Sequence, residues 1–233
     1  TDIGMVREVN QDTFRMEYDM ETGRGMFLVC DGMGGAAAGE VASGLAADAF
    51  LQSMDNCWKE RFDAVNLKKR LLESYDQVNE VVFDASRANP DYAGMGTTMV
   101  AVVCGDGQAL VGNVGDSRAY FLDETGMRQI TEDHSLVTEL MKRGDLTPYQ
   151  ASRHPSRNVI TRAMGADATV QCDTFTEAVK PNASPAKYII KTATWSIPVD
   201  KGKFFFLIKI RIIKSSSFKI TFKCNSNFSV FIK

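Results

Sequence analysis

The segment FLVCDGMGGAAAGEVAS, residues 27–43, joins an apolar run to a cluster of glycines and then to a helix-like pattern. Residues 27–30 predict a short buried strand, because an apolar run followed by glycines is typical of one. Three glycines within 32–35 indicate a tight turn or a close approach of the backbone, since glycine adopts conformations that other residues avoid. Asp31 ends the strand, where a carboxylate can hold a cation or cap the turn that follows. The segment alone leaves both interpretations open.

The bulk composition restricts the class of protein. The chain has 233 residues, of which 44% are hydrophobic, so we expect one domain, with or without an appendage. A formal net charge of −2 gives no general attraction to nucleic acid or to an anionic membrane. Five cysteines without a CxxC pair argue against a disulfide framework, and no signal peptide or membrane-spanning run is visible. We therefore expect a cytoplasmic protein that binds neither nucleic acid nor membrane. Because the chain begins at Thr1 rather than at Met, we also expect its natural start to be missing.

Strand and helix patterns follow one another along the chain. Short β-type stretches surround the NQD segment at 10–12, and β-rich runs between 97 and 131 predict an antiparallel meander. Helical spacing predicts one helix over 40–55 and a second over 66–86. Residues 132–165 are polar, with a helical middle and an irregular flap. Two consecutive helices within a β-rich chain favour an α+β layered domain.

The C-terminal tail differs in composition from the rest of the chain. Residues 203–233 contain no Asp, Glu, Gly or Ala, yet they hold seven basic residues and seven of the fourteen phenylalanines. Alternation of Phe218, Ile220 and Phe222 would suit a pair of strands. We favour a non-native ending, such as a frameshift, over that interpretation, and both over a basic tail used for binding.

Three carboxylates stand beside glycine or polar turn residues at the ends of β-type runs: Asp12, Asp31 and Asp116. Each alone is ordinary turn chemistry, but together they favour a shared edge that collects a divalent cation. Mg²⁺ and Mn²⁺ take oxygen ligands, and two such ions sharing a carboxylate can activate water at neutral pH. A nearby arginine would bind phosphate in bidentate fashion, and Arg7 is the candidate.

Other hydrolytic centres find little support in the sequence. No cysteine has the Cys-x5-Arg spacing of a thiolate phosphatase, and no GxxxxGK[ST] loop occurs. A Ser/His/Asp centre would have to use His134 or His154, and both fall in the polar stretch. We expect both histidines to be surface or flap residues.

Six segments occur in the order typical of one family: TDIGMVREVNQD, FLVCDGMGGAAAGEVAS, GMGTTMVAVV, VGNVGDSRAYFL, QITEDHSLVTELMKRGDLT and HPSRNVITRAMG. Over residues 1–175 the chain resembles the metal-dependent protein phosphatases (PPM, the type 2C serine/threonine class) in their bacterial style. The resemblance implies an α+β fold, a four-layer αββα sandwich with a central antiparallel β-sandwich. It also implies hydrolysis of phosphoserine and phosphothreonine by metal-activated water, without a phosphoenzyme.

The resemblance further implies a role for each candidate site residue. Asp31 would bridge two Mn²⁺ or Mg²⁺ ions, Gly32 would offer its carbonyl, and Asp12 would act from the outer shell through water. Asp116 would belong to a third, weaker metal site, and Arg7 would bind the phosphate. Residues 132–165 match the flap beside the active site. The expected partners are phosphorylated proteins, made by a serine/threonine kinase, and the expected state is a monomer.

The sequence departs from the family pattern in two places. A family strand that ends in Asp-Gly-Leu, with the Asp a direct metal ligand, corresponds to KYIIKTATWSIP, where Ala193 or Thr194 replaces that Asp. The family's closing Asp-Asn-x-Thr motif has no counterpart, because no Asp follows Asp200. We expect a phosphatase domain over 1–200 and an atypical tail over 201–233. The departures keep two alternatives open: an inactive pseudophosphatase that binds phosphoproteins, and a defective product.

Overall fold

The computed structural model describes residues 9–19, 21–35, 38–55, 57–123, 126–178, 187–191 and 205–209, with the backbone alone for 122–123, 126 and the last two ranges. The elements in chain order are β1 (Asp12–Asp19), β2 (Arg24–Met33), α1 (Ala38–Met54), η1 (Cys57–Lys59), α2 (Ala64–Ala88), η2 (Pro90–Tyr92), β3 (Gly96–Thr97), β4 (Met99–Gly105), β5 (Gln108–Val114), β6 (Arg118–Asp123), β7 (Gly126–Gln129), α3 (Leu136–Arg143), α4 (Pro148–Arg153), β8 (Asp173–Ala178), β9 (Lys187–Lys191) and β10 (Phe205–Lys209).

The strands form two sheets. The first has the order β1-β2-β4-β5-β8, with every neighbouring pair antiparallel and β3 added to the end of β2. The second has the order β10-β9-β6-β7, so the chain passes from one sheet to the other between β5 and β6. The predicted antiparallel meander is thereby confirmed for β4 to β7, apart from this change of sheet.

One pair of strands is parallel, whereas the other pairs of both sheets are antiparallel, as in the mostly antiparallel sandwich predicted. β9 and β10 pair in parallel, with Phe205 opposite Lys187. Parallel neighbours need a crossover connection rather than a hairpin. The residues that make this connection, 192–204, lie outside the described residues, as does the alternation predicted at 218–222.

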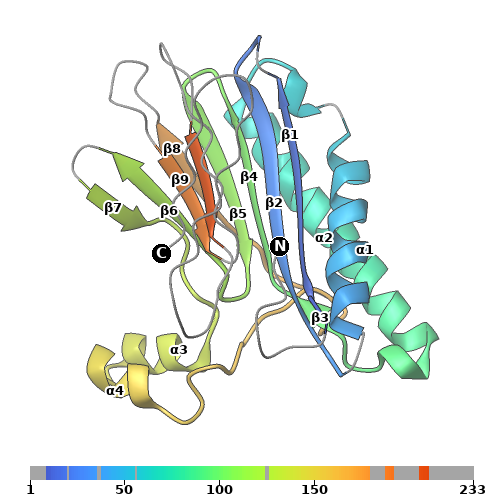
Figure 1. Cartoon of the computed structure of the whole chain (residues 1–233), viewed down its shortest axis with the longest axis vertical. Coiled ribbons are helices and arrows are strands. Elements are labelled where there is room, and N and C mark those ends of the chain that lie inside the picture. Colours follow the sequence, from blue (N-terminus) through green and yellow to red (C-terminus); the bar gives the residue numbers. More distant parts are fainter. Residues whose placement is uncertain are drawn as a thin grey trace.

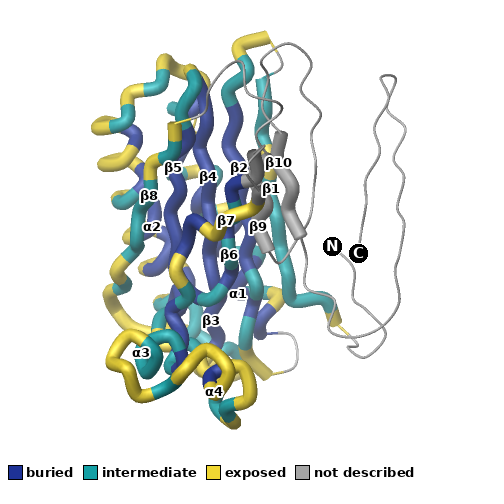
Figure 2. Tube along the Cα trace, turned by 90° about the vertical axis from the view of Figure 1, so that its left-hand side faces the viewer, coloured by how far each residue is buried: buried dark blue, intermediate teal, exposed yellow. Residues whose placement is uncertain are grey.

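β2 is buried on both of its faces, which explains its continuous apolar run. Met26, Leu28 and Cys30 point to the helices, whereas Phe27 and Val29 point to the second sheet. Each face belongs to a separate core cluster, one between the helices and the first sheet and one between the sheets. Cys104 of β4 lies in the second cluster. Among the described residues, Figure 2 shows the central strands β2, β4 and β5 as the most buried.

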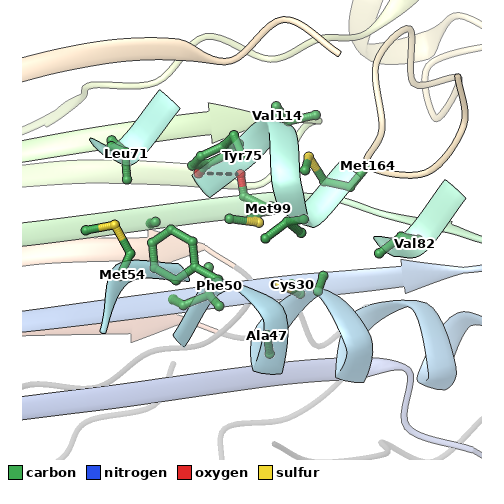
Figure 3. Packing of buried hydrophobic residues seen from close by; sticks show 14 of the residues in the cluster. Cys30, Ala47, Phe50, Met54, Leu71, Tyr75, Val82, Met99, Val114 and Met164 are labelled. Atoms are coloured by element: carbon green, nitrogen blue, oxygen red, sulfur yellow. Dashed lines mark hydrogen bonds between the residues drawn. The ribbon is translucent and has the colours of Figure 1, made fainter. Parts of the chain in front are cut away.

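Helix α2 confirms the helix predicted over 66–86. It starts at the N-cap Asp63, whose side chain accepts hydrogen bonds from the backbone N–H groups of Val65 and Asn66. Its buried residues recur every three or four positions, as a one-sided amphipathic helix requires; they include Leu67, Leu71, Tyr75, Val78 and Val82. Tyr75 meets Phe50 of α1 edge to face, with ring centroids 6.1 Å apart (Figure 3).

Helix α1 confirms the helix predicted over 40–55 from the spacing of Val41, Leu45, Ala49 and Met54, but of these four only Met54 is fully buried. Val41, Leu45 and Ala49 are only partly buried and pack at the margin of the core. The fully buried positions are mostly small: Ala42, Ser43, Ala46 and Ala47, with Phe50 and Met54 beyond them. Small side chains let the helix lie close to the first sheet, so size rather than hydrophobicity selects the inner face.

The described elements form three layers, with α1 and α2 side by side on the first sheet and the second sheet on its other face (Figure 1). The α+β class and the central β-sandwich are confirmed. The second outer helical layer of a four-layer αββα arrangement is not among the elements described. α3 and α4 instead lie at one end of the sandwich (Figure 1). Within the described ranges, no helix combines the length and apolar character that crossing a bilayer requires.

Candidate functional site

The pairing of β1 with β2 brings two of the predicted site carboxylates together. Asp12 is directly opposite Asp31 in the antiparallel register. Opposed residues of such a pair point to the same face, with Cβ atoms about 4.5–5.5 Å apart. Strand alternation puts Asp31 on the face of Phe27 and Val29, so both carboxylates lie at the mouth of the space between the sheets. Both side chains are half-buried.

Gly32 is the next residue of β2 and is buried. Its N–H donates to the carbonyl oxygen of Gln11 at 3.0 Å. A Cβ at this position would lie 1.9 Å from the carbonyl oxygen of Gly39, in the first turn of α1. The glycine is therefore required by the close approach of α1. This contact agrees with the close approach of the backbone that the glycine cluster predicts.

Thr98 connects the end of β2 to the turn that carries Asp116. Its N–H donates to the carbonyl oxygen of Asp31 at 3.0 Å, and its hydroxyl accepts from the N–H of Asp31 at 3.0 Å. The same hydroxyl lies 2.7 Å from that of Ser117, and both side chains are buried. Because Ser117 follows Asp116, these bonds hold Asp116 near Asp31.

A cavity of about 330 Å³ lies beside these carboxylates. Asp31 and Asp116 line it together with residues of the flap helices α3 and α4, among them Val137, Thr138, Met141, Pro148, Ala151 and Ser152. The structure thus places the polar segment 132–165 next to the predicted site. α4, which starts at a Thr147–Gln150 capping box, was not predicted.

The rim of the cavity carries two arginines with different surroundings. Arg118 makes an ion pair with Asp133 through its Nε and Nη2 atoms. This pair holds the start of β6 against the residues before α3. Arg157 also lines the cavity and is exposed. The predicted phosphate ligand, Arg7, lies outside the described residues.

The donor atoms at this edge suit a hard cation. Mg²⁺ is commonly held by one or two carboxylates with waters, and the facing pair Asp12 and Asp31 meets that need. Among the described residues, no group of three His, Cys, Asp or Glu side chains is arranged to hold a metal ion. The pair can therefore start a metal site, while further ligands would have to come from water, substrate or other parts of the chain.

His134 lies at the start of the flap segment 132–165 but is buried, so the surface position expected as one alternative is wrong for this residue. Its Nδ1 accepts from the N–H of Gly115 at 3.0 Å, and its Nε2 lies 3.1 Å from Asp173 Oδ2. Arg162 pairs with the other oxygen of Asp173 at 3.0 Å. Burial lowers the pKa of His134, and Arg162 adds to this effect, whereas Asp173 opposes it.

This contact of a buried histidine was missed by sequence reasoning, because 39 residues separate His134 from Asp173 and the β5–β8 pairing brings Asp173 near the end of β5. By contrast, His154 is partly exposed in a turn after α4, where its Nδ1 accepts from the N–H of Ser156 at 3.1 Å. A flap position was expected for His154, and the structure confirms it.

The two-sheet sandwich with carboxylates at one edge agrees with the resemblance to the metal-dependent phosphatases, and comparison with known proteins supports this class. The sequence profile of the family described as protein phosphatase 2C matches residues 6–164. The chain belongs to this family, the metal-dependent protein serine/threonine phosphatases.

Named relatives agree with the family match. Serine/threonine phosphatase stp of Listeria monocytogenes serotype 4b (strain F2365) is 37% identical over 178 residues, which cover 75% of this chain and 69% of the relative. Protein phosphatase PhpP of Streptococcus pneumoniae serotype 2 (strain D39) is 36% identical over 174 residues, 74% of this chain and 69% of the relative.

Solved structures agree as well. The crystal structure of serine/threonine phosphatase Stp1 from Staphylococcus aureus has a TM-score of 0.68 at 35% identity and covers 76% of this chain and 68% of its own. The catalytic domain of serine threonine protein phosphatase PstP, in complex with two manganese ions, has a TM-score of 0.64 at 28% identity, covering 79% and 71%.

Proposed function

We propose that the chain hydrolyses phosphoserine and phosphothreonine in proteins at the edge where β1, β2 and the β5–β6 turn meet. The observation that carries this proposal is the facing pair Asp12 and Asp31, with Asp116 lining the same cavity as Asp31. Like charges directly opposite one another weaken a sheet, so the pair gains most from a cation between or beside its members.

Two Mn²⁺ or Mg²⁺ ions are the proposed cofactors, with a third, weaker site. Asp31 would contact both ions, Gly32 would offer its carbonyl oxygen, Asp12 would act through water, and Asp116 would serve the weaker site. When bound, such ions activate water at neutral pH and offset the charge of the phosphate. Support for two ions comes from the PstP structure, which contains two manganese ions.

The remaining residues of the site would bind and orient the substrate. Arg7 is the proposed bidentate ligand of the phosphate. The cavity under α3 and α4 has both apolar and hydroxyl-bearing walls, which suits the residues next to a phosphorylated side chain. The proposed substrates are phosphoproteins made by a serine/threonine kinase, and the proposed enzyme is a cytoplasmic monomer that uses neither nucleic acid nor membrane.

The proposed domain spans 1–200, with an atypical tail over 201–233. Because Ala193 or Thr194 stands in place of a metal-binding Asp and no Asp follows Asp200, less negative charge opposes the repulsion between the ions. We therefore propose that this chain binds its metal ions more weakly than a family member with both carboxylates.

The test compares two proteins: the chain itself, and a version whose residues 179–233 are replaced by the corresponding C-terminal segment of the Listeria phosphatase. Phosphate release from phosphothreonine and phosphoserine peptides is measured with and without Mn²⁺, with a phosphotyrosine peptide as control. We expect Mn²⁺-dependent release by the replaced chain, weaker release by the original, and none after Asp31→Asn. If the replaced chain were inactive while still binding a phosphoprotein, the binding-module alternative would be favoured instead.

A further inference from the structure

The turn between β5 and β6, residues 115–117, carries Asp116 at the point where the chain changes sheet. Gly115 has a φ of +104°, and a Cβ there would lie 2.6 Å from Thr98 Cγ2. On the other side of Asp116, the Ser117 hydroxyl meets that of Thr98 at 2.7 Å. The position of Asp116 therefore depends on what holds the backbone of its two neighbours.

His134 holds the backbone of Gly115 at two points. The N–H of Gly115 donates to His134 Nδ1 at 3.0 Å, and the N–H of His134 donates to the carbonyl oxygen of Gly115 at 3.0 Å. Both polar groups of the glycine backbone are thus engaged by one residue. Since Nδ1 accepts, the proton of the neutral ring is on Nε2, where it can be donated to Asp173.

Asp173 fixes the orientation of the imidazole, and Arg162 holds Asp173 in place. Asp173 lies in β8, opposite Asn113 of β5, and its second oxygen pairs with Arg162 at 3.0 Å. The same Arg162 nitrogen lies 3.3 Å from His134 Nε2. The side chain is about 5% exposed, its Nδ1 accepts from Gly115 and its Nε2 faces Asp173, so the ring is not placed to take a proton from a substrate.

We infer that His134 is a positioning residue for Asp116: it fixes the Gly115 backbone so that the Asp116 carboxylate lies where a cation can use it. The inference rests on the proposed function, because it takes Asp116 as a metal ligand. Residues that orient a metal ligand typically change metal affinity by about 10-fold or more when they are replaced.

Two substitutions separate positioning from simple packing. His134→Asn keeps an acceptor near the place of Nδ1, facing Gly115, but gives up the contact with Asp173. His134→Gln places its amide near the position of Nε2 and keeps the contact with Asp173, but gives up the acceptor for Gly115. If His134 only stabilises the fold through Asp173, the Asn variant will be the more damaged; if it positions Asp116, the Gln variant will lose more metal affinity.

The measurement is the binding of Mn²⁺ to the purified full chain, from the loss of the electron paramagnetic resonance signal of the free ion, with melting temperatures recorded in parallel. Asp116→Asn and the double variant with His134→Gln are included. We expect His134→Gln to weaken the weaker Mn²⁺ site about 10-fold. His134→Asn should stay within about 3-fold of the unaltered chain, and the double variant should bind no worse than Asp116→Asn alone.

Each other outcome has a distinct meaning. If Asp116→Asn weakens Mn²⁺ binding but His134→Gln does not, the positioning role is wrong and the proposed function stands. If Asp116→Asn leaves Mn²⁺ binding unchanged, the proposed metal role of Asp116 fails, and the inference fails with it. If the Asn and Gln variants lose affinity equally, in step with their melting temperatures, His134 acts through overall stability and the inference is overturned.

Discussion

The ring of Tyr75 lies against the backbone of Gly112: a Cβ on Gly112 would be 2.8 Å from a ring carbon of the tyrosine. The phenol of Tyr75 also donates to the carbonyl oxygen of Met99 at 3.3 Å, across the interface between α2 and the first sheet (Figure 3). One side chain therefore joins α2 to both β4 and β5.

Removing only the hydroxyl of Tyr75 should have a small effect on stability. Tyr75→Phe loses one buried hydrogen bond, so we expect a loss of about 1 kcal/mol in the free energy of unfolding. Tyr75→Ala removes the whole ring from the core and should cost about 3–5 kcal/mol. Urea unfolding followed by circular dichroism measures both values. Equal losses in the two variants would show that the hydroxyl rather than the ring carries the contact.

A side chain at position 32 should prevent α1 from docking. Gly32→Ala places a methyl group 1.9 Å from the carbonyl oxygen of Gly39, and backbone on both sides cannot move aside as a flexible side chain would. We expect a loss of about 3 kcal/mol or more. The matched control is Gly44→Ala, within α1, where nothing lies within 4 Å of the added Cβ. That change should stabilise the helix by about 0.5–1 kcal/mol.

The Asp12→Asn variant should be more stable than the unaltered chain without divalent ions, and it should gain less stability from Mn²⁺. Without divalent ions, Asp12→Asn removes a like-charge contact with Asp31 and should raise the stability by about 0.2–1 kcal/mol. With Mn²⁺, the unaltered chain should gain stability and the variant should gain less, because binding to the folded state alone stabilises it. Melting curves in EDTA and in Mn²⁺ test both signs. A variant that melts lower than the unaltered chain in EDTA would contradict the assumed repulsion.

Acid should destabilise the chain partly through His134. Its pKa is lowered from 6.5 in the folded state, mainly by burial, so the unfolded state binds more protons as the pH falls below about 6.5. This contribution is complete above pH 6.5 and is lost as the pH falls through the folded-state pKa. Urea unfolding at pH 7.5, 6.5 and 5.5 should therefore give a steeper decline for the unaltered chain than for His134→Gln, which has no titrating ring. Parallel declines would assign the acid sensitivity to other groups.

The sequence was sufficient for elements with a strong repeating pattern. β2 is recognisable from its continuous apolar run, because a strand buried on both faces needs apolar residues throughout. α2 is recognisable from apolar residues every three or four positions, because only one of its faces is buried. α1 was predicted as a helix, but its buried alanines contrast too little with their neighbours to reveal the inner face. The parallel pairing of β10 with β9 has no local signature, since it depends on a crossover connection.

The candidate site was predictable to the extent that it depends on strand ends. Asp12 and Asp31 each end or begin a β-type run, so their meeting at one edge follows from antiparallel pairing. The glycines predict a close approach of the backbone, but neither Gly39 as the partner of Gly32 nor the contact of His134 with Asp173 was predictable, because both depend on how whole elements pack. Both contacts stabilise the sheet edge that carries the carboxylates, but neither involves Asp12, Asp31 or Asp116.

The two core clusters each contain a fully buried thiol, Cys30 on the helix side of the first sheet and Cys104 between the sheets. Burial raises the pKa of both thiols, that of Cys104 to about 12, so neither is an effective nucleophile while the layers stay closed. Alkylation at either sulfur must wait for a local opening. In a chain whose other three cysteines are replaced by serine, the rate at Cys30 would report detachment of the helices, and the rate at Cys104 would report separation of the two sheets. The molecule thus contains two buried thiols whose alkylation rates report separately on the opening of each interface between its layers.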